Sequence, residues 1–528
     1  MFIFKDFKAR MTVALVLILS LSLLGMGRVA SLTIKQNESY NQNKISIFLE
    51  SGRGNFYYSN GTKITGNTRA YANIFLPEES AIKTYFASAR GSEIVVGEKA
   101  FKNNRPAVLR RSEKIIGKGI FAVEIENRYE NFSSMEHIIG YINGESNGVF
   151  SLEKGYEKVL KNENPIYADF FIDAKGEFLF GVYPTIRGKK NDNKIHLTVD
   201  SNIQKICEGE AQNFPKGAIV VSEIKTGKIR GIVSRPSFSP ENISDYLEST
   251  ESPFVNRALS CYNVGSVFKP LIAAAICENN ESDFKETCLG VAQISGLNFH
   301  CYLRSGHGEM DLKNAISQSC NCFFYSAVNR VEPQKILNLA SSLMFTSSIK
   351  LGSNIFSQRG TLPSAAELNN PATAANFSIG QGSVLLSPLA ITNLYSAIAN
   401  DGVYYTPTII EGVTQDGKFT KENKGARNTV FTKSTAAELK NFLKNVVSFG
   451  TGTAALPLSG GAAGKTATAQ TGKFTEKGEI INSWFCGFFP FKNPKYAVTV
   501  FLEDANDTQV SATEIFKNIA DSIISLEE

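Results

Sequence analysis

One uncharged, apolar stretch near the N-terminus limits what this chain can fold into. It runs from Met11 to Met26 without a charged residue and continues to Leu32 with Arg28 as the single interruption. A membrane-spanning helix needs about 20 apolar residues, and this stretch supplies them if the Arg28 side chain extends to the membrane interface. We therefore predict that residues 11–32 form a transmembrane anchor rather than part of a globular core.

The charged residues around this stretch predict its orientation. Three basic residues precede it, namely Lys5, Lys8 and Arg10. Because basic flanks of a membrane helix remain in the cytoplasm, residues 1–10 are expected to form a cytoplasmic tail, and the chain after residue 32 should be extracytoplasmic. The alternative is a cleaved signal peptide that ends near Val29-Ala30-Ser31. Arg28 disfavours cleavage at that site, so a retained anchor is the preferred interpretation.

The composition of the 528-residue chain is that of a globular protein with two or three domains, since 43% of its residues are hydrophobic and 20% are charged. The net charge is +5, and no long basic run is interleaved with aromatic residues, so nucleic acid is not expected as a partner. The polar segment 187–194 is typical of a linker between domains. We therefore predict one domain over residues 33–190 and a second over residues 191–528.

The second of these domains mixes strand-like and helix-like patterns. Strands are expected over residues 217–222, 228–234, 483–489 and 496–502, and helices over residues 266–278 and 511–526. Ser511 and Glu514 have the spacing of a capping box at the start of the last helix. The apolar face of that helix, formed by Ile515, Ile519 and Ile523, should pack against the sheet. The patterns together predict an α+β fold.

The expected helix over residues 266–278 begins with a serine and a lysine three residues apart, Ser266 and Lys269. Positions i and i+3 lie on one helix face, so the lysine amine can reach the serine hydroxyl. A serine hydroxyl is a weak nucleophile without a nearby base, and burial can lower the pKa of a lysine until it serves as one. The alternative is an exposed helix start without a catalytic role, because such tetrapeptides often arise by chance.

Two further polar motifs follow this helix. Ser319-Cys-Asn321 can place a hydroxyl and an amide on the same side of a loop, and the alternative is a simple turn or helix cap. Small residues and hydroxyls surround Lys465 between Gly464 and Gln470, which suits an edge strand that a peptide can pair with. A phosphate-binding loop is not indicated there, because Ser459 stands where that pattern requires glycine.

In their order and separation, the three motifs resemble the Ser-x-x-Lys, Ser-x-Asn and Lys-Thr-Gly set of penicillin-recognising enzymes. Residues 195–505 are similar to the transpeptidase domain of class B penicillin-binding proteins, and the segments around Asn60 and His137 are similar to their pedestal. The resemblance implies an antiparallel sheet flanked by helices, a helical subdomain, an elongated N-terminal pedestal or dimerisation-like domain over residues 33–190, and one transmembrane helix.

The resemblance also implies a reaction. Ser266 would attack the penultimate D-alanine of a peptidoglycan stem peptide, release the last D-alanine and pass the acyl group to the amine of a second stem. Lys269 would accept the serine proton, and Ser319, with Lys465 nearby, would pass it to the leaving amine. The implied substrate-binding residues are Asn321, Thr466, Ala467 and Thr468. The implied oxyanion hole consists of the backbone N–H groups of Ser266 and Thr468.

Ligands and partners follow from the same resemblance. β-Lactams are expected as inhibitors, and no cofactor or metal is expected. The chain is too short for an additional glycosyltransferase domain, so a separate membrane glycan polymerase is the expected partner. Two departures from the family stand out: Ala467 replaces the usual glycine, where its methyl group would crowd the substrate, and Tyr58-Ser59 replaces the usual Asp-Arg before Asn60.

Two other functions remain open on the sequence. The first is a β-lactam sensor or a β-lactamase, but Ala365 stands where class A lactamases carry the glutamate that activates water, and Glu367 is out of register. The second is a non-catalytic scaffold for a glycan polymerase, which a complete set of motifs disfavours. The sequence leaves open whether the protein acts in elongation, division or sporulation.

Eight cysteines follow the anchor. Disulfides persist in exported domains, and Cys288 and Cys301 flank a short loop-like segment, which makes them the first candidates for a bridge. The interpretation that we favour is that most of the cysteines are small buried hydrophobes. A zinc site is not indicated, because the closely spaced Cys320 and Cys322 lack a second such pair. His307 is interpreted as structural, since no Gly-x-Ser-x-Gly motif accompanies the histidines.

Overall fold

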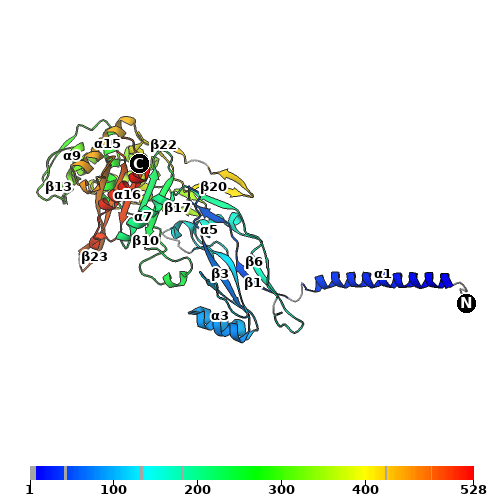
Figure 1. Cartoon of the computed structure of the whole chain (residues 1–528). Helices are drawn as coiled ribbons and strands as arrows, with labels where there is room; N and C mark the ends of the chain where they lie inside the picture. Colours follow the sequence, from blue (N-terminus) through cyan, green and yellow to red (C-terminus); the bar gives the residue numbers. More distant parts are fainter. Residues whose placement is uncertain (1–6, 41–43, 130–134, 180–181, 423–424, 477) are drawn as a thin grey trace. The chain divides into compact units, whose positions relative to one another are not determined.

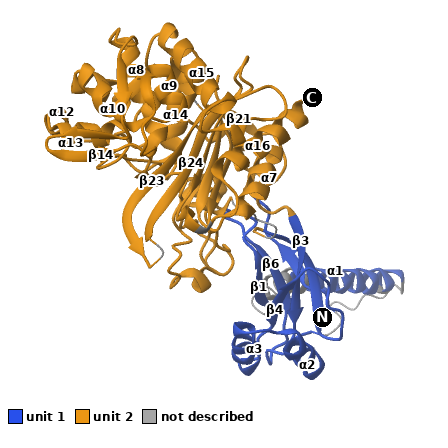
Figure 2. Ribbon diagram, turned by 90° about the vertical axis from the view of Figure 1, so that its left-hand side faces the viewer, with its two compact units in different colours: residues 1–53, 68–127, 162–191 blue, residues 54–67, 128–161, 192–528 orange. Residues whose placement is uncertain are grey.

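The computed structural model describes residues 7–40, 44–129, 135–179, 182–422, 425–476 and 478–528 (Figure 1). The chain forms two compact units, which Figure 2 colours separately. The smaller unit comprises residues 1–53, 68–127 and 162–191, and the larger unit comprises residues 54–67, 128–161 and 192–528. The last boundary falls within the predicted linker. In contrast to the predicted domains, residues 54–67 and 128–161 belong to the larger unit.

The smaller unit begins with one long helix, α1 (Phe7–Tyr40). Its span Met11–Ser31 is apolar on average, with Arg28 as the charged exception, and none of these 21 residues is buried. A helix of this length rises about 32 Å, which matches the hydrocarbon core of a bilayer at about 30 Å. The segment predicted as the anchor is therefore helical, and it is long and apolar enough to cross a membrane. Residues 1–6 of the predicted cytoplasmic tail lie outside the described residues.

Two three-stranded antiparallel sheets make up most of the rest of the smaller unit, in the orders β1–β6–β7 and β4–β3–β5. Their strands are β1 (Lys44–Glu50), β3 (Thr68–Phe75), β4 (Ala107–Arg111), β5 (Ile120–Asn127), β6 (Ile166–Phe171) and β7 (Thr185–Arg187), and the helices are α2 (Glu79–Ser88) and α3 (Ser92–Lys102). Alternate residues of β3, such as Ala72 and Ile74, enter a core that also contains Leu49 and Phe170. This alternation is what a strand with one buried face requires.

A five-stranded antiparallel sheet forms the centre of the larger unit, in the order β10–β9–β25–β24–β23. The strands are β9 (Gly217–Glu223), β10 (Ile229–Arg235), β23 (Ala463–Thr475), β24 (Gly478–Phe489) and β25 (Tyr496–Leu502). All four predicted strands are confirmed. The segment around Lys465 forms β23 at one edge of this sheet, so the predicted edge strand is confirmed as well.

Helices cover both faces of this sheet (Figure 2). On one face lie α7 (Ser201–Glu210) and the C-terminal helix α16 (Ala512–Glu527), whose three predicted isoleucines are buried against the sheet. Ser511 and Glu514 form the predicted capping box at the start of α16. On the other face lies α14 (Pro388–Ala399), in which every residue is buried. A helix that is buried all round lies in the centre of a large core, and α14 occupies that place.

The region beyond α14 is mainly helical. Its helices are α8 (Lys269–Glu278), α9 (Leu312–Ser317), α10 (Asn321–Ala327), α11 (Pro333–Ser342), α12 (Ala365–Leu368), α13 (Pro371–Ser378) and α15 (Lys433–Ser448). Short strand pairs connect them, formed by β11 (Tyr262–Asn263) with β18 (Leu385–Leu386), β12 (Lys285–Cys288) with β15 (Gly308–Asp311), β13 (Val291–Ile294) with β14 (Leu297–His300), β16 (Lys350–Gly352) with β17 (Ile355–Phe356), and β19 (Val403–Tyr405) with β22 (Arg427–Thr429). Residues 269–277 of α8 are all buried, which confirms the predicted apolar helix.

Residues 54–67 join the larger unit through a second sheet, β2–β8–β20–β21, and residues 128–161 add three short helices. Its strands are β2 (Asn55–Tyr57), β8 (Lys194–Leu197), β20 (Ile410–Gln415) and β21 (Lys418–Lys421), and the short helices beside it are α4 (Glu136–Ile139), α5 (Ser151–Gly155) and α6 (Glu157–Leu160). Arg128 and Glu153 form a buried ion pair at 2.7 Å within these segments. The larger unit therefore includes parts of the chain that precede residue 190.

Candidate active site

Ser266 lies in a single turn of 3₁₀ helix, Gly265–Phe268, directly before α8. It is half-buried, whereas both of its neighbours in the chain are buried. Gly265 adopts a left-handed conformation with φ of 60°, and its N–H donates to the carbonyl of Gly380 at 2.9 Å. A methyl group on Gly265 would lie 3.2 Å from the Ala469 side chain, so strand β23 packs closely against the turn that presents the serine.

The Lys269 side chain is fully buried at the first position of α8. Its amine donates to the carbonyl of Ser319 at 2.8 Å, to the Ser319 hydroxyl at 3.3 Å and to Oδ1 of Asn321 at 2.7 Å. Burial lowers the pKa of this amine to about 7, because it removes the charged form from water. Lys269 is therefore available as a neutral base near neutral pH.

Ser319 lies on the loop between α9 and α10, and Asn321 is the first residue of α10. Ser319 is buried and adopts a left-handed conformation with φ of 55°, which is uncommon for a residue other than glycine. The turn aims both residues at Lys269. The structure therefore brings together three predicted residues, from the first and second motifs, in one hydrogen-bonded group.

Lys465 is the second fully buried lysine of the site. It lies on β23, and its amine donates to the carbonyl of Thr466 at 3.1 Å. Its pKa is lowered well below the usual range, first by burial and then by the charge of Lys269. Two buried amines that repel each other hold fewer protons than two exposed ones, so Lys465 takes up a proton less readily than an exposed lysine.

The remaining predicted residues alternate along the edge strand. Thr466 is partly exposed and its hydroxyl lies 2.9 Å from that of Thr451, and Thr468 is exposed. Ala467 is only 5% exposed, and its methyl group faces Gly265 rather than the open side of the strand. Ala467 therefore affects the spacing between β23 and the Ser266 turn. The sequence had instead led to the expectation that its methyl group crowds the substrate directly.

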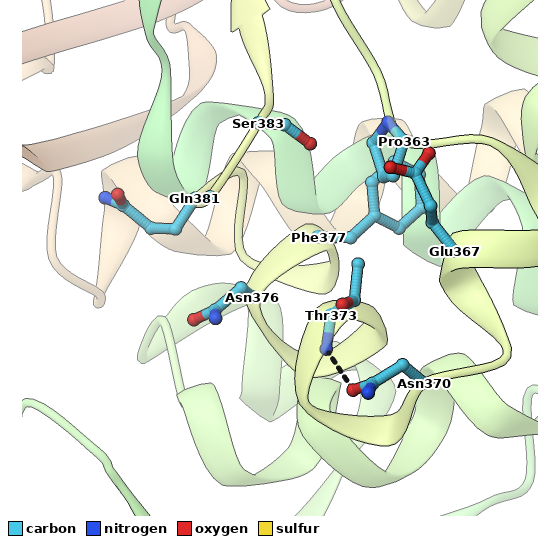
Figure 3. A pocket seen from close by; sticks show the side chains of 9 residues that line it. Pro363, Glu367, Asn370, Thr373, Asn376, Phe377, Gln381 and Ser383 are labelled. Atoms are coloured by element: carbon cyan, nitrogen blue, oxygen red, sulfur yellow. Dashed lines mark hydrogen bonds between the residues drawn. The ribbon is translucent and has the colours of Figure 1, made fainter.

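Glu367, the carboxylate closest in sequence to the lactamase position, has a structural role. It closes a capping box at the start of α12, where it accepts from the N–H of Ser364 at 2.7 Å. It also lines a pocket of about 440 Å³ with Thr373, Phe377 and Ser383 (Figure 3). The pocket lies beside the Gly380 turn that supports Gly265. A carboxylate that is held in a helix cap is not positioned as a free base for water.

A group of sulfur and nitrogen atoms lies beside the second motif, and sequence reasoning did not predict it. The ligand atoms of Cys288, Cys301, His307 and Cys320 all lie within 4.8 Å of one another. All eight cysteines are free, so Cys288 and Cys301, the first candidates for a bridge, do not form a disulfide. The four residues come from three segments: Cys288 ends β12, Cys301 and His307 lie between β14 and β15, and Cys320 directly precedes α10. A search for paired Cys-x-x-Cys motifs therefore missed them. Their crowding into residues 288–320 was the available signal.

Comparison with known proteins identifies the class that this fold and site define. Residues 217–521 match the family described as the penicillin binding protein transpeptidase domain. The chain therefore belongs to the penicillin-binding protein transpeptidase family, and its full-length relatives place it among the class B members. The predicted class, its α+β fold and its transpeptidase activity are thereby confirmed.

Individual relatives span most of the chain. Stage V sporulation protein D of Bacillus subtilis is 28% identical over 517 residues, which cover 90% of this chain and 77% of that protein. The peptidoglycan D,D-transpeptidase MrdA of Haemophilus influenzae is 24% identical over 447 residues, covering 77% and 66%. Among solved structures, penicillin-binding protein 2 of Helicobacter pylori in complex with MreC has a TM-score of 0.68 at 20% identity, covering 92% of this chain and 99% of that one.

Proposed function

We propose that this protein is a membrane-anchored peptidoglycan D,D-transpeptidase that joins stem peptides through an acyl-enzyme on Ser266. The observation that carries the proposal is the Lys269 amine. It is fully buried, its pKa is lowered to about 7, and it lies one turn along the chain from a half-buried serine. A base whose pKa lies near the pH at which the enzyme operates has a substantial neutral fraction and still binds a proton well. General base catalysis requires both properties.

Acylation begins with proton transfer from the Ser266 hydroxyl to the Lys269 amine. Among the contacts of the described residues, that amine donates to Ser319 and Asn321, and no hydrogen bond joins it to Ser266. Catalytic hydrogen bonds are often long before the substrate binds, so a small movement of the side chain completes this contact. The serine oxygen then bonds to the carbonyl carbon of the penultimate D-alanine.

Breakdown of the tetrahedral intermediate breaks the bond between this carbon and the nitrogen of the terminal D-alanine. The leaving amine needs a proton, and the Ser319 hydroxyl, 3.3 Å from the Lys269 amine, can relay the one taken from Ser266. The N–H groups of Ser266 and Thr468 are the proposed oxyanion hole. The amine of a second stem then attacks the ester, restores the Ser266 hydroxyl and forms the cross-link.

Substrate binding follows from the position of β23 at the sheet edge. An extended peptide can add to an exposed edge as another strand, with main-chain hydrogen bonds that fix its register. The hydroxyls of Thr466 and Thr468 would then contact the terminal carboxylate, and the Asn321 amide would hold the stem backbone. β-Lactams present a reactive carbonyl and a carboxylate to the same groups, which accounts for the proposed inhibition.

We propose that α1 anchors the protein with residues 1–10 in the cytoplasm and the larger unit outside, because the basic residues precede the apolar span. A separate membrane glycan polymerase is the proposed partner, which would supply the glycan strands that carry the stems. Exchange of the smaller unit, which includes residues 11–32, for the corresponding part of an unrelated anchored protein should abolish co-purification of the two. Unchanged co-purification would show that the partner binds elsewhere or not at all.

The test of the enzymatic function uses the full-length chain in detergent. Treatment with a fluorescent penicillin, followed by proteolysis and mass spectrometry, should place a stable adduct on Ser266, and the enzyme should release D-alanine while it joins stem peptides on nascent glycan. Ser266→Ala should lose both signals. Rapid turnover of the drug would indicate a lactamase, an adduct without cross-linking would indicate a sensor, and the absence of any adduct would indicate a scaffold.

A further inference from the structure

The atoms grouped around His307 have the spacing of a tetrahedral metal site. The Cys288 and Cys301 sulfurs each lie 3.5 Å from Nδ1 of His307. In a tetrahedral zinc site, the Zn–S bond is about 2.3 Å and the Zn–N bond is about 2.0 Å, so a sulfur ligand and a nitrogen ligand lie about 3.5 Å apart. Cys320 completes the set, since its sulfur lies within 4.8 Å of the other three ligand atoms.

The surroundings of the four residues suit thiolates bound to a metal ion. All three cysteines are at most 1% exposed, so bulk water does not compete for their sulfurs. The backbone N–H of Asn321 donates to the Cys301 sulfur at 3.4 Å. The second ring nitrogen of His307 lies 3.4 Å from the Tyr302 hydroxyl, which can fix the orientation of the ring. Metal sites commonly have such outer contacts, which hold the ligands in place.

The backbone around these residues is also tightly constrained. A methyl group on Gly306 would lie 2.3 Å from the Cys288 carbonyl, and one on Gly290 would lie 2.0 Å from the Arg304 carbonyl. Both glycines adopt left-handed conformations that other residues rarely adopt. The chain segments that carry Cys288 and His307 can approach so closely only because glycines stand at these two positions.

We propose that Cys288, Cys301, His307 and Cys320 bind one zinc ion in a closed tetrahedral structural site. Three thiolates and one imidazole are a ligand set that zinc prefers, and four protein ligands leave no open position for catalysis. Each thiol gives up its proton to solvent when it binds, so loading the site releases up to three protons. The proposal replaces the expectation from the sequence that the protein carries no metal.

The ion would hold the catalytic loop. Cys320 is the middle residue of the second motif, and its two neighbours, Ser319 and Asn321, are the hydrogen-bond partners of Lys269. A metal ion bound to Cys320 would tie this loop to the end of β12, where Cys288 lies, and so fix the geometry of both neighbours. This consequence rests on the proposed function, whereas metal binding by itself does not.

The experiment measures metal content and ligand type on the full-length chain in detergent. After purification without chelator and dialysis against zinc, elemental analysis should find one equivalent of zinc per chain. Replacement by cobalt should give the intense sulfur-to-cobalt charge-transfer bands of a thiolate site. Cys301→Ala should lose the zinc and these bands, and Cys207→Ala, a buried cysteine of α7 in the other core, should keep both. If Cys301→Ala fails to fold, His307→Ala should weaken zinc binding at least tenfold and shift the cobalt spectrum.

Two results would overturn the proposal. One is a chain without zinc after dialysis, in which thiol counting finds a disulfide among the cluster cysteines. The other is zinc bound equally well by the wild type, Cys301→Ala and His307→Ala. The effect on the loop is tested separately, since removal of the metal should slow penicillin acylation and its return should restore the rate. A zinc-loaded chain that never acylates would count against the proposed function but not against the site.

Discussion

Replacement of Asn321 by aspartate is the sharpest test of the role given to Lys269. The substitution keeps the size of the side chain and places a carboxylate where Oδ1 now lies, 2.7 Å from the Lys269 amine. An opposite charge this close shifts a pKa by roughly 1 to 3 units in favour of the charged form. The pKa of Lys269 should therefore rise from about 7 toward about 8 to 10.

The expected loss of rate follows from the fraction of neutral amine. At pH 7 about half of the Lys269 amines are neutral in the wild type, and about one in 10 to one in 1,000 would be neutral in Asn321→Asp. Acylation by a fluorescent penicillin at pH 7 should fall by roughly 5- to 500-fold. The rate should rise with pH in both proteins, because the base must be neutral, but its midpoint should lie higher in the variant.

Asn321→Ala is the matched control, because it removes the amide without adding a charge. Its acylation should be slower at every pH, since the substrate contact is lost, while the midpoint stays close to that of the wild type. Stopped-flow measurements between pH 5 and pH 10 give both quantities. If the midpoint of Asn321→Asp coincides with that of the wild type, Lys269 is not the base that limits acylation.

Three further substitutions test other parts of the structure. Gly380→Ala would place a methyl group 2.2 Å from the Gly265 carbonyl, so it should displace the Ser266 turn and slow acylation at least tenfold, as fluorescent penicillin labelling can measure. Ser511→Ala removes the cap of α16 and should lower the free energy of unfolding by about 1 kcal/mol in denaturant titrations. Burial raises the pKa of Glu136 to about 8, from 4.5 in the unfolded chain. Below pH 4.5 the carboxyl group is protonated in both states and does not change the free energy of unfolding. As pH rises toward 8, only the unfolded state loses this proton, so the fold is increasingly destabilised. Glu136→Gln should therefore melt at a higher temperature than the wild type at pH 8.5 but not at pH 4, and equal melting at both values would refute this origin.

The sequence predicted the elements of the larger unit well, because each one carries a clear local signal. The apolar helix after Ser266, the two strands near the C-terminus and the capping box at Ser511 all follow from spacing within a few residues. The group around Lys269 was also predictable, since its members belong to the first two of three motifs whose order matches a known family. Their burial and mutual contacts then depend on packing that no single motif specifies.

What the sequence did not predict depends on contacts between distant segments. Cys288 and His307 lie close together because Gly290 and Gly306 let their backbones approach. Gly306 belongs to a Gly-His-Gly segment that resembles the transpeptidase family, but that segment alone does not indicate which residues it contacts. The larger unit also includes residues 54–67 and 128–161 from far upstream, so the two compact units differ from a division at a single linker near residue 190. The inward direction of the Ala467 methyl group follows from strand register, which a single sequence does not fix.

The interleaved route of the chain has a practical consequence for anyone who wishes to shorten the protein. Strand β2 hydrogen-bonds to β8 in parallel register, and Arg128 and Glu153 form their ion pair within the same unit. A fragment that starts at residue 192 would lose β2 and leave the edge of β8 bare, which invites aggregation. A soluble version should therefore begin just after the membrane helix α1. During export, β2 cannot complete its sheet until β8 and β20, which lie far along the chain, have also been exported.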